Sequence, residues 1–294
     1  MLTGEYFVLD GALALAVPVR FGQQLRVTEG HHVSHHHWAS LDHQGRPWFE
    51  GRFSAMGAYL SGTEELVGRR LESLLQGIER QRPDFWLGKP LYRFETRLGF
   101  PRQWGLGSSS TLVAALADWA EVDAFQLLAD TFGGSGYDIA CAHARQPILF
   151  QRRDGSRHFV ECPYTPAFAD NICFVYLGKK QDSREGIARY RQVVQDSPRL
   201  IQRISSLTMA FLGARTPQEG IAIMDAHEQL VSEALQLPKV KDRYFHSFPG
   251  AVKSLGAWGG DFVLALSDRP AEVTRQYFRV KGFETVFTWG EMAL

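Results

Sequence analysis

The chain has 294 residues, in which 32 lysines and arginines balance 32 aspartates and glutamates. This length allows one large domain or two lobes that share a cleft. A net charge of zero excludes a global field that would attract nucleic acid or an anionic membrane. The three cysteines, Cys141, Cys162 and Cys173, have apolar neighbours and no metal-ligand spacing, which favours reduced thiols in the cytoplasm over a disulfide framework.

Neither a secretory signal nor a membrane span is predicted. The first residues lack a basic region and a continuous apolar run. No apolar segment approaches the roughly 18 residues that a transmembrane helix needs. We therefore expect a cytoplasmic monomer or homodimer with no membrane or nucleic acid partner.

Strand-like segments dominate the first fifty residues. Residues 5–19 predict a hairpin that turns at Asp10–Gly11, residues 21–28 a strand, and residues 38–53 a second hairpin. Five histidines occur within residues 31–37. They fit either a transition-metal site or a solvated loop at a strand end, and the lack of a nearby carboxylate or cysteine favours the loop.

A helix and a strand come before the most informative segment. Residues 63–80 carry apolar side chains at helical spacing, with Thr63 as the expected N-cap. Residues 91–96 alternate as a strand does. The sequence then continues as Pro101-Arg-Gln-Trp-Gly-Leu-Gly-Ser-Ser-Ser-Thr111, and an apolar run predicts a helix over residues 108–120.

Glycine and hydroxyl residues cluster where this helix begins. Their backbone N–H groups would have no partner within the helix and would lie beside the positive end of its dipole; these residues are Gly105, Leu106, Gly107, Ser108, Ser109 and Ser110. Such a segment suits a phosphate group, but serine and glycine also begin helices for conformational reasons alone. The segment lacks the Gly-Lys-Ser/Thr ending of a P-loop and the spacing of a dinucleotide fingerprint. On its own it fits both a phosphate cradle and an ordinary capped helix start.

A second glycine cluster comes directly before Asp138. The sequence Gly133-Gly-Ser-Gly-Tyr-Asp138 follows a helix predicted over residues 123–132, and its glycines allow close approach of the backbone. Asp138 would lie near a helix start. Its carboxylate is interpreted either as an N-cap or as a base or metal ligand that faces the phosphate cradle.

The second half alternates strands with helices and predicts an α+β fold with an antiparallel sheet. Lys179 and Lys180 follow a buried strand and fit either an anionic substrate or ordinary solvation. Polar turns near residues 152–170 predict a division into lobes of residues 1–160 and 161–294. The predicted elements are strands at 147–151, 157–161, 171–177, 262–266 and 284–289, and helices at 184–194, 198–212, 217–235 and 270–280.

Three separated segments resemble the ordered motifs of the GHMP small-molecule kinases, which include galactokinase, homoserine kinase, mevalonate kinase and phosphomevalonate kinase. The segments are Glu5-Tyr-Phe-Val-Leu-Asp-Gly-Ala-Leu-Ala-Leu-Ala, Pro101-Arg-Gln-Trp-Gly-Leu-Gly-Ser-Ser-Ser and Gly256-Ala-Trp-Gly-Gly-Asp261. Gly134-Ser-Gly-Tyr-Asp138-Ile-Ala is most similar to phosphomevalonate kinases and to a group of bacterial GHMP-type proteins that share Gly-Tyr-Asp-Ile-Ala. The resemblance implies a two-lobed α+β fold with an N-terminal ribosomal-S5-like lobe and a C-terminal ferredoxin-like lobe.

The resemblance also implies roles for individual residues. Residues 105–110 would wrap the phosphates of ATP, Ser108 would reach Mg²⁺, and Asp138 would orient or deprotonate the acceptor hydroxyl. The residues that would line the acceptor side and brace the cradle are Glu5, Tyr6, Gly259, Gly260 and Asp261. The implied function is transfer of the γ-phosphoryl group of ATP to a hydroxyl or phosphate of a small, mevalonate-like metabolite. Positioning and charge neutralisation do most of the catalysis in such reactions.

The sequence departs from the family at three places. Several members carry a lysine just upstream of the first motif, whereas the first lysine here is Lys89. We expect either that a strand is missing ahead of Met1 or that this cation is absent, with Lys179 and Lys180 as substitutes. Trp258 stands where glycine is common and would narrow the acceptor pocket or prop the phosphate loop. The metal carboxylate of mevalonate kinases has no match at its usual spacing, and Asp130 is the nearest candidate.

These departures keep a second hypothesis open. A GHMP-fold protein could bind a nucleotide or metabolite for regulation without catalysis. A purely structural role is weaker, since a scaffold needs neither glycine-rich loop.

Overall fold

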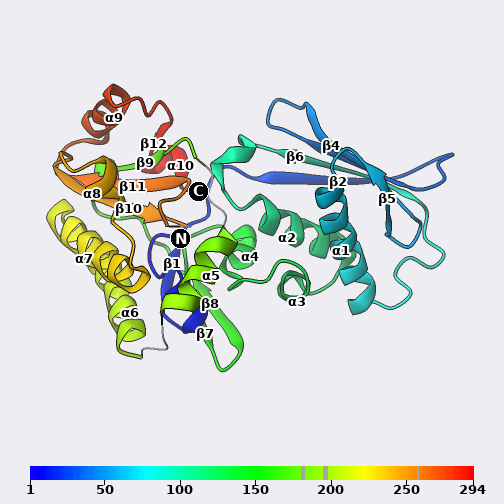
Figure 1. Ribbon diagram of the computed structural model, residues 1–294, viewed down its shortest axis with the longest axis horizontal. Coiled ribbons are helices and arrows are strands. Elements are labelled where there is room, and N and C mark those ends of the chain that lie inside the picture. Colours follow the sequence, from blue (N-terminus) through cyan, green and yellow to red (C-terminus); the bar gives the residue numbers. More distant parts are fainter. Residues whose placement is uncertain (180–182, 195–197, 257) are drawn as a thin grey trace. The chain divides into compact units, whose positions relative to one another are not determined.

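The computed structural model describes residues 1–179, 183–194, 198–256 and 258–294 (Figure 1). The chain forms two compact units. The central unit contains residues 21–102 and 106–143, and the terminal unit contains residues 1–20, 103–105 and 144–294. Among the described residues, no helix combines the length and apolar character needed to cross a membrane.

A five-stranded sheet forms one layer of the central unit, in the order β2-β6-β3-β4-β5. Its neighbouring strands are antiparallel except β3 and β6, which are parallel. Side chains alternate between buried and exposed along β4 and β6, as expected for a sheet with one covered face. The strands are β2 (Gln23–Glu29), β3 (His36–Leu41), β4 (Pro47–Phe53), β5 (Tyr59–Gly62) and β6 (Tyr92–Leu98).

Helices form the other layer of the central unit. Figure 1 shows α1 (Glu65–Gln81), α2 (Ser108–Ala120) and α3 (Ala124–Ala129) on one side of the sheet. The short helix α4 (Tyr137–His143) packs against α2. The core lies between the layers, where Trp38 stacks on Phe94 with their ring centroids 4.9 Å apart.

The terminal unit contains two antiparallel sheets. The larger one has the order β10-β11-β9-β12, and β11 is buried along its whole length because α7 packs on one face and α9 on the other. The smaller sheet has the order β1-β7-β8. The strands are β1 (Ala14–Ala16), β7 (Ile148–Arg153), β8 (Ser156–Glu161), β9 (Ile172–Tyr176), β10 (Gly250–Leu255), β11 (Phe262–Ser267) and β12 (Val286–Thr288). The helices are α5 (Ser183–Val193), α6 (Pro198–Gly213), α7 (Pro217–Leu235), α8 (Val240–Tyr244), α9 (Ala271–Val280) and α10 (Trp289–Met292).

The predicted α+β class is confirmed, and most predicted elements lie within a few residues of their observed bounds. The helix predicted over residues 108–120 is α2 without any shift. The hairpin predicted in residues 38–53 is the pair β3 and β4. The three cysteines are free thiols, and Cys173 is buried.

The first predicted hairpin is wrong. Residues Phe7–Asp10 form the 3₁₀ helix η1, which begins after Tyr6 at φ 62° and ends at Gly11 at φ 99°. Residues with positive φ turn the chain on itself at both ends of this segment, so it cannot extend as a strand. Only Ala14–Ala16 forms a strand, and it pairs with β7.

Two local predictions also need correction. Thr63 does not cap α1, because its hydroxyl accepts the N–H of Glu50 at 3.1 Å and Glu64 takes the N-cap position. His36 is not solvated: it is 1% exposed, its Nδ1 accepts the N–H of Tyr92 at 2.8 Å, and its Nε2 lies 3.2 Å from the carbonyl oxygen of Ala55.

The two units do not divide at residue 160. Residues 1–20 belong to the terminal unit because β1 pairs with β7, and residues 144–160 belong there because they form β7 and β8. Residues 103–105 also belong to the terminal unit, since the ring of Trp104 packs on Phe262 and Phe287, with ring centroids 6.0 and 5.3 Å apart. The lobes expected from polar turns, 1–160 and 161–294, therefore differ from the compact units.

Candidate active site

Two glycines shape the segment that leads into α2. Gly105 has φ +67° and Gly107 has φ +76°, in the left-handed region that other residues rarely adopt. The chain passes from the terminal to the central unit between Gly105 and Leu106. The Gly-Leu-Gly spacing thus follows from two sharp backbone turns placed directly before the helix.

In the terminal unit, Asp261 lies against Gly105. A Cβ atom at Gly105 would be 1.8 Å from Oδ2 of Asp261, so any side chain there would collide with the carboxylate. The carbonyl oxygen of Asp261 accepts the N–H of Leu177 at 2.9 Å, which ties it to the end of β9. The last residue of the third motif therefore supports the backbone of Gly105.

In the central unit, α2 begins without a side-chain cap from any described residue. Its N-cap is Gly107, and the hydroxyl of Thr111 is engaged with Oε1 of Gln23 at 2.9 Å. The start of α2 therefore lacks the side-chain cap that one interpretation assumed, while its two glycines with positive φ fit both that interpretation and a phosphate cradle. N–H groups at a helix start have no partner within the helix, and the helix dipole favours an anion beside them.

Asp138 lies in the first turn of α4, close to the start of α2. Its Oδ1 is 4.0 Å from the position that a Cβ atom of Gly107 would occupy. Gly133 and Gly134 have φ values of +69° and +104°, and a Cβ atom at either would meet nothing within 4 Å. Backbone conformation rather than crowding thus requires these glycines. Asp138 lies within the first turn of α4 rather than before it, so the interpretation of its carboxylate as an N-cap is wrong.

The surroundings of Asp138 make its carboxylate more basic. The side chain is half-buried. Burial raises the pKa of Asp138 above its ordinary value, and a hydrogen bond with the side chain of Tyr137 opposes this increase. A carboxyl group with a raised pKa accepts a proton more readily once it is ionised, which suits a general base.

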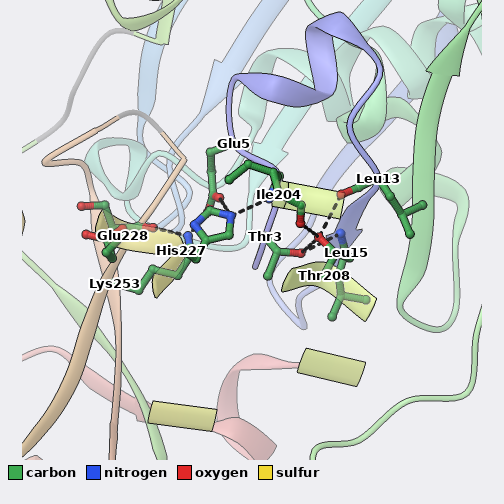
Figure 2. A network of polar contacts seen from close by, with 11 residues as sticks. Thr3, Glu5, Leu13, Leu15, Ile204, Thr208, His227, Glu228 and Lys253 are labelled. Carbon is green, nitrogen blue, oxygen red and sulfur yellow. Dashed lines mark hydrogen bonds and ion pairs between the residues drawn. The ribbon is translucent and has the colours of Figure 1, made fainter. Parts of the chain in front are cut away.

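The first motif is held inside the terminal unit. Glu5 is 5% exposed and forms an ion pair with Lys253 of β10 (Figure 2). The hydroxyl of Tyr6 accepts the N–H of Trp258 at 2.7 Å, and its ring stacks on that of Tyr190 at 5.8 Å. Burial raises the pKa of Tyr6. Both residues that begin the motif are thus bonded to residues near the third motif.

Comparison with known proteins identifies the fold. No protein-family model matches the sequence, and no curated protein matches it. Solved structures match nearly the whole chain: a Lin0012 protein from Listeria innocua is 15% identical with a TM-score of 0.70, covering 97% of this chain and 93% of that chain. The chain has the GHMP kinase fold.

Two structures with bound small molecules share this GHMP fold. Streptococcus pneumoniae phosphomevalonate kinase, in complex with phosphomevalonate and AMPPNP, is 15% identical with a TM-score of 0.68, covering 98% of this chain and 96% of that chain. Lactococcus lactis galactokinase, in complex with galactose, is 11% identical with a TM-score of 0.69, covering 98% of this chain and 90% of that chain. The fold expected from three short motifs is therefore confirmed.

Several residues expected to contact the acceptor in a GHMP kinase are now placed. Lys179 is exposed beyond the end of β9, and Lys180 lies outside the described residues. Gly259 has φ 72° and Gly260 is buried. Trp258 donates from Nε1 to the carbonyl oxygen of Pro238 at 3.1 Å, so both its nitrogens bond within the terminal unit. Contact of these residues with a substrate remains a prediction.

The residues expected to hold Mg²⁺ are Ser108 and Asp130. Asp130 is exposed at the end of α3, where it accepts the side-chain N–H of Gln126 at 2.7 Å. Among the described residues, no three side chains of histidine, cysteine, aspartate or glutamate gather to hold a metal ion. Magnesium usually combines one or two carboxylates with waters and phosphate oxygens, so both assignments remain predictions.

Three buried ionisable residues were missed from the sequence: His227, Glu228 and Lys253. Lys253 lies in the middle of β10, in the run Ala-Val-Lys-Ser-Leu. The sequence contained one signal that could have identified it. A lysine within a short, mostly apolar run just before a recognised motif needs a partner if that run is buried.

Proposed function

We propose that this GHMP-fold protein is a kinase that transfers the γ-phosphoryl group of ATP to a hydroxyl or phosphate of a small metabolite. One observation carries the proposal. Within the central unit, the carboxylate of Asp138 lies beside Gly107 at the start of a helix that no described side chain caps. An anion-binding helix start and a proton acceptor in one place are the groups that phosphoryl transfer to a hydroxyl needs.

The start of α2 would bind phosphate oxygens of ATP. The N–H groups of Leu106 to Ser110 supply donors, and the helix dipole adds a favourable field. Asp261 would keep Gly105 in the left-handed conformation from which this segment proceeds. The hydroxyl of Ser108, with Asp130 as the second candidate, would hold Mg²⁺, which neutralises phosphate charge when it is bound with ATP.

Asp138 would act on the acceptor. Its raised pKa suits a carboxylate that receives the proton of an acceptor hydroxyl while that oxygen attacks phosphorus. The backbone around it is set by the left-handed glycines before α4, so the side chain is held on a short, packed helix. General-base groups of this kind contribute about 10²- to 10⁴-fold to a rate.

The test separates nucleotide binding from turnover. Calorimetric titration with Mg²⁺ and AMPPNP is followed by a kinase screen with mevalonate, phosphomevalonate and galactose as the first acceptors. Asp138→Asn should keep AMPPNP affinity and reduce kcat by about 10³-fold. Asp242→Asn, which removes an exposed carboxylate of the terminal unit, is the matched control and should leave kcat unchanged.

Each outcome decides between the hypotheses. Turnover by Asp138→Asn at the wild-type rate would refute the role of Asp138. Binding of AMPPNP without turnover of any acceptor would favour the regulatory, non-catalytic alternative. Absence of both binding and turnover would overturn the kinase proposal itself.

A further inference from the structure

A second polar centre lies in the interior of the terminal unit. Glu5, His227, Glu228 and Lys253 come from the first motif, α7 and β10, and each is at most 5% exposed (Figure 2). Burying ionisable side chains is unfavourable unless their charges are balanced and hydrogen-bonded. The cluster therefore needs a role that compensates for this cost.

The charges of the cluster balance. Lys253 donates to Oε1 of Glu5 and to the carbonyl oxygen of Ser254 at 3.0 Å. The Nε2 atom of His227 accepts the N–H of Gly4 at 3.0 Å, so this ring carries its proton on Nδ1 and is neutral. Burial lowers the pKa of His227 and raises that of Glu228 to about 8, which leaves Glu228 protonated at neutral pH. One ammonium and one carboxylate remain.

The cluster fixes two chain segments that are distant in sequence. His227 bonds the backbone of Gly4, and Oε1 of Glu228 accepts the N–H of Ser254 at 3.1 Å. Helix α7 thus holds the segment before Tyr6 on one side and the end of β10 on the other. Lys253 connects the same two segments directly through Glu5.

The same two segments meet again at Tyr6, which follows Glu5, and at Trp258, which comes after the end of β10. The hydroxyl of Tyr6 accepts the N–H of Trp258, inside the loop that joins β10 to β11. This loop ends at Asp261, whose carboxylate lies against Gly105. A continuous series of contacts therefore runs within the terminal unit from Glu5 through Lys253, β10 and Asp261 to Gly105.

We propose that Lys253 is a positioning residue, which pairs with Glu5 so that the third motif holds Gly105 in place at the start of the glycine-serine segment. It acts on nucleotide binding only through this backbone. The consequence for nucleotide binding rests on the proposed function, whereas the consequence for the backbone of residues 103–105 does not.

The experiment uses the full chain and a charge-neutral pair of substitutions. Lys253→Met leaves the carboxylate of Glu5 buried without its partner, whereas Glu5→Gln with Lys253→Met removes both charges at similar volume. Hydrogen exchange of residues 103–105 should be about tenfold faster in Lys253→Met and return to the wild-type rate in the double variant. AMPPNP affinity, measured well below the melting temperature, should fall about tenfold in Lys253→Met and return to the wild-type value in the double variant. Lys281→Met, at an exposed lysine of the same unit, is the control that should change neither quantity.

The alternatives give different results. A lower melting temperature with unchanged exchange at residues 103–105 would show that the pair stabilises the core only, and would overturn the proposal. Equal losses in the single and double variants would show that Lys253 does not act through Glu5, and would also overturn it. If the wild type does not bind AMPPNP, the kinase proposal fails while the exchange comparison still decides the positioning role.

A milder variant covers loss of folding. Should Lys253→Met fail to fold, Glu5→Gln alone is measured, because glutamine keeps an acceptor oxygen for the ammonium group. Exchange at residues 103–105 should then rise by a smaller factor in the same direction. An unchanged rate in this variant would contradict the proposal.

Discussion

The two polar centres of this protein differ in charge balance and in exposure. At the start of α2, N–H groups lack a side-chain cap among the described residues, and the carboxylate of the half-buried residue Asp138 lies close by. In the terminal unit, Glu5 and Lys253 neutralise each other and are almost fully buried. The first arrangement leaves hydrogen-bond donors for a ligand, whereas the two opposite charges of the second are paired with each other. Polar residues that belong to motifs can thus serve either chemistry or positioning.

The largest expected effect comes from breaking the buried pair. Lys253→Met should lower the free energy of unfolding by about 3 to 5 kcal/mol, because it leaves a carboxylate buried without its partner. The double variant, Lys253→Met with Glu5→Gln, should lose much less free energy of unfolding. Urea unfolding of the wild type, both single variants and the double variant measures the coupling. Additive losses would contradict a charge-balanced pair.

A smaller but local effect is expected at the glycine-serine segment. Gly105→Ala would place a Cβ atom 1.8 Å from Oδ2 of Asp261, in addition to the strain of a positive φ. We expect a loss of about 2 to 3 kcal/mol in stability and a marked loss of AMPPNP affinity. Gly133→Ala is a matched control, because it has a similar φ of +69° and nothing within 4 Å of its Cβ position. It should lose only about 1 kcal/mol, and equal losses at both positions would exclude steric support by Asp261.

The buried centre should also give a defined pH dependence. Glu228 keeps its proton in the folded state up to a pKa of about 8 but loses it near 4.5 when unfolded, so its contribution to stability falls as pH rises across this interval. His227 has a lowered pKa in the folded state, so its contribution rises with pH and is complete above 6.5. Below pH 6.5 the two residues change the free energy of unfolding in opposite directions as pH rises. From pH 6.5 to about 8, only the contribution of Glu228 changes.

Unfolding experiments can isolate this slope. Between pH 6.5 and 8, Glu228 should reduce the free energy of unfolding by about 2 kcal/mol, from about 1.4 kcal/mol per pH unit for one proton. Glu228→Gln keeps an oxygen for the N–H of Ser254 and should remove this decrease. A variant with the same pH dependence as the wild type would show that Glu228 is already ionised at pH 6.5.

The smallest effect is expected for an exposed pair in the central unit. His143 Nε2 lies 3.0 Å from Oδ1 of Asp118, and both side chains are largely exposed. Asp118→Asn should therefore change the free energy of unfolding by less than about 1 kcal/mol, since solvent screens such pairs. Thermal unfolding of Asp118→Asn and of Lys253→Met, measured side by side, compares the loss of an exposed ion pair with the loss of a buried one in the same protein. Similar losses would remove the distinction between the two centres.

Sequence patterns predicted what depends on neighbouring residues. An apolar run predicted a helix with the bounds of α2, and strand-like segments within residues 38–53 predicted the hairpin of β3 and β4. The glycine-serine segment and the glycines before Asp138 could be singled out because local backbone turns require glycine there. These features are encoded within a dozen residues.

The remaining features depend on contacts between distant residues. The pair of Glu5 and Lys253 joins residues 248 positions apart, and no local pattern specifies it. The positive φ of Tyr6 starts η1 in a strand-like sequence, and Tyr6 is held in place by Trp258 and Tyr190. Strand β10 was missed since a lysine and a serine interrupt its apolar residues, and both become buried only beside α7. Tertiary packing therefore decides the elements that local propensity leaves undetermined.

The start of α2 is proposed to bind the phosphates of ATP. Hydrogen exchange of backbone amides in residues 106–110, measured with and without AMPPNP and Mg²⁺, tests it most directly. We expect strong protection of these amides on nucleotide binding, with little change in residues 156–161 of β8. Binding of AMPPNP that leaves residues 106–110 unprotected would contradict it.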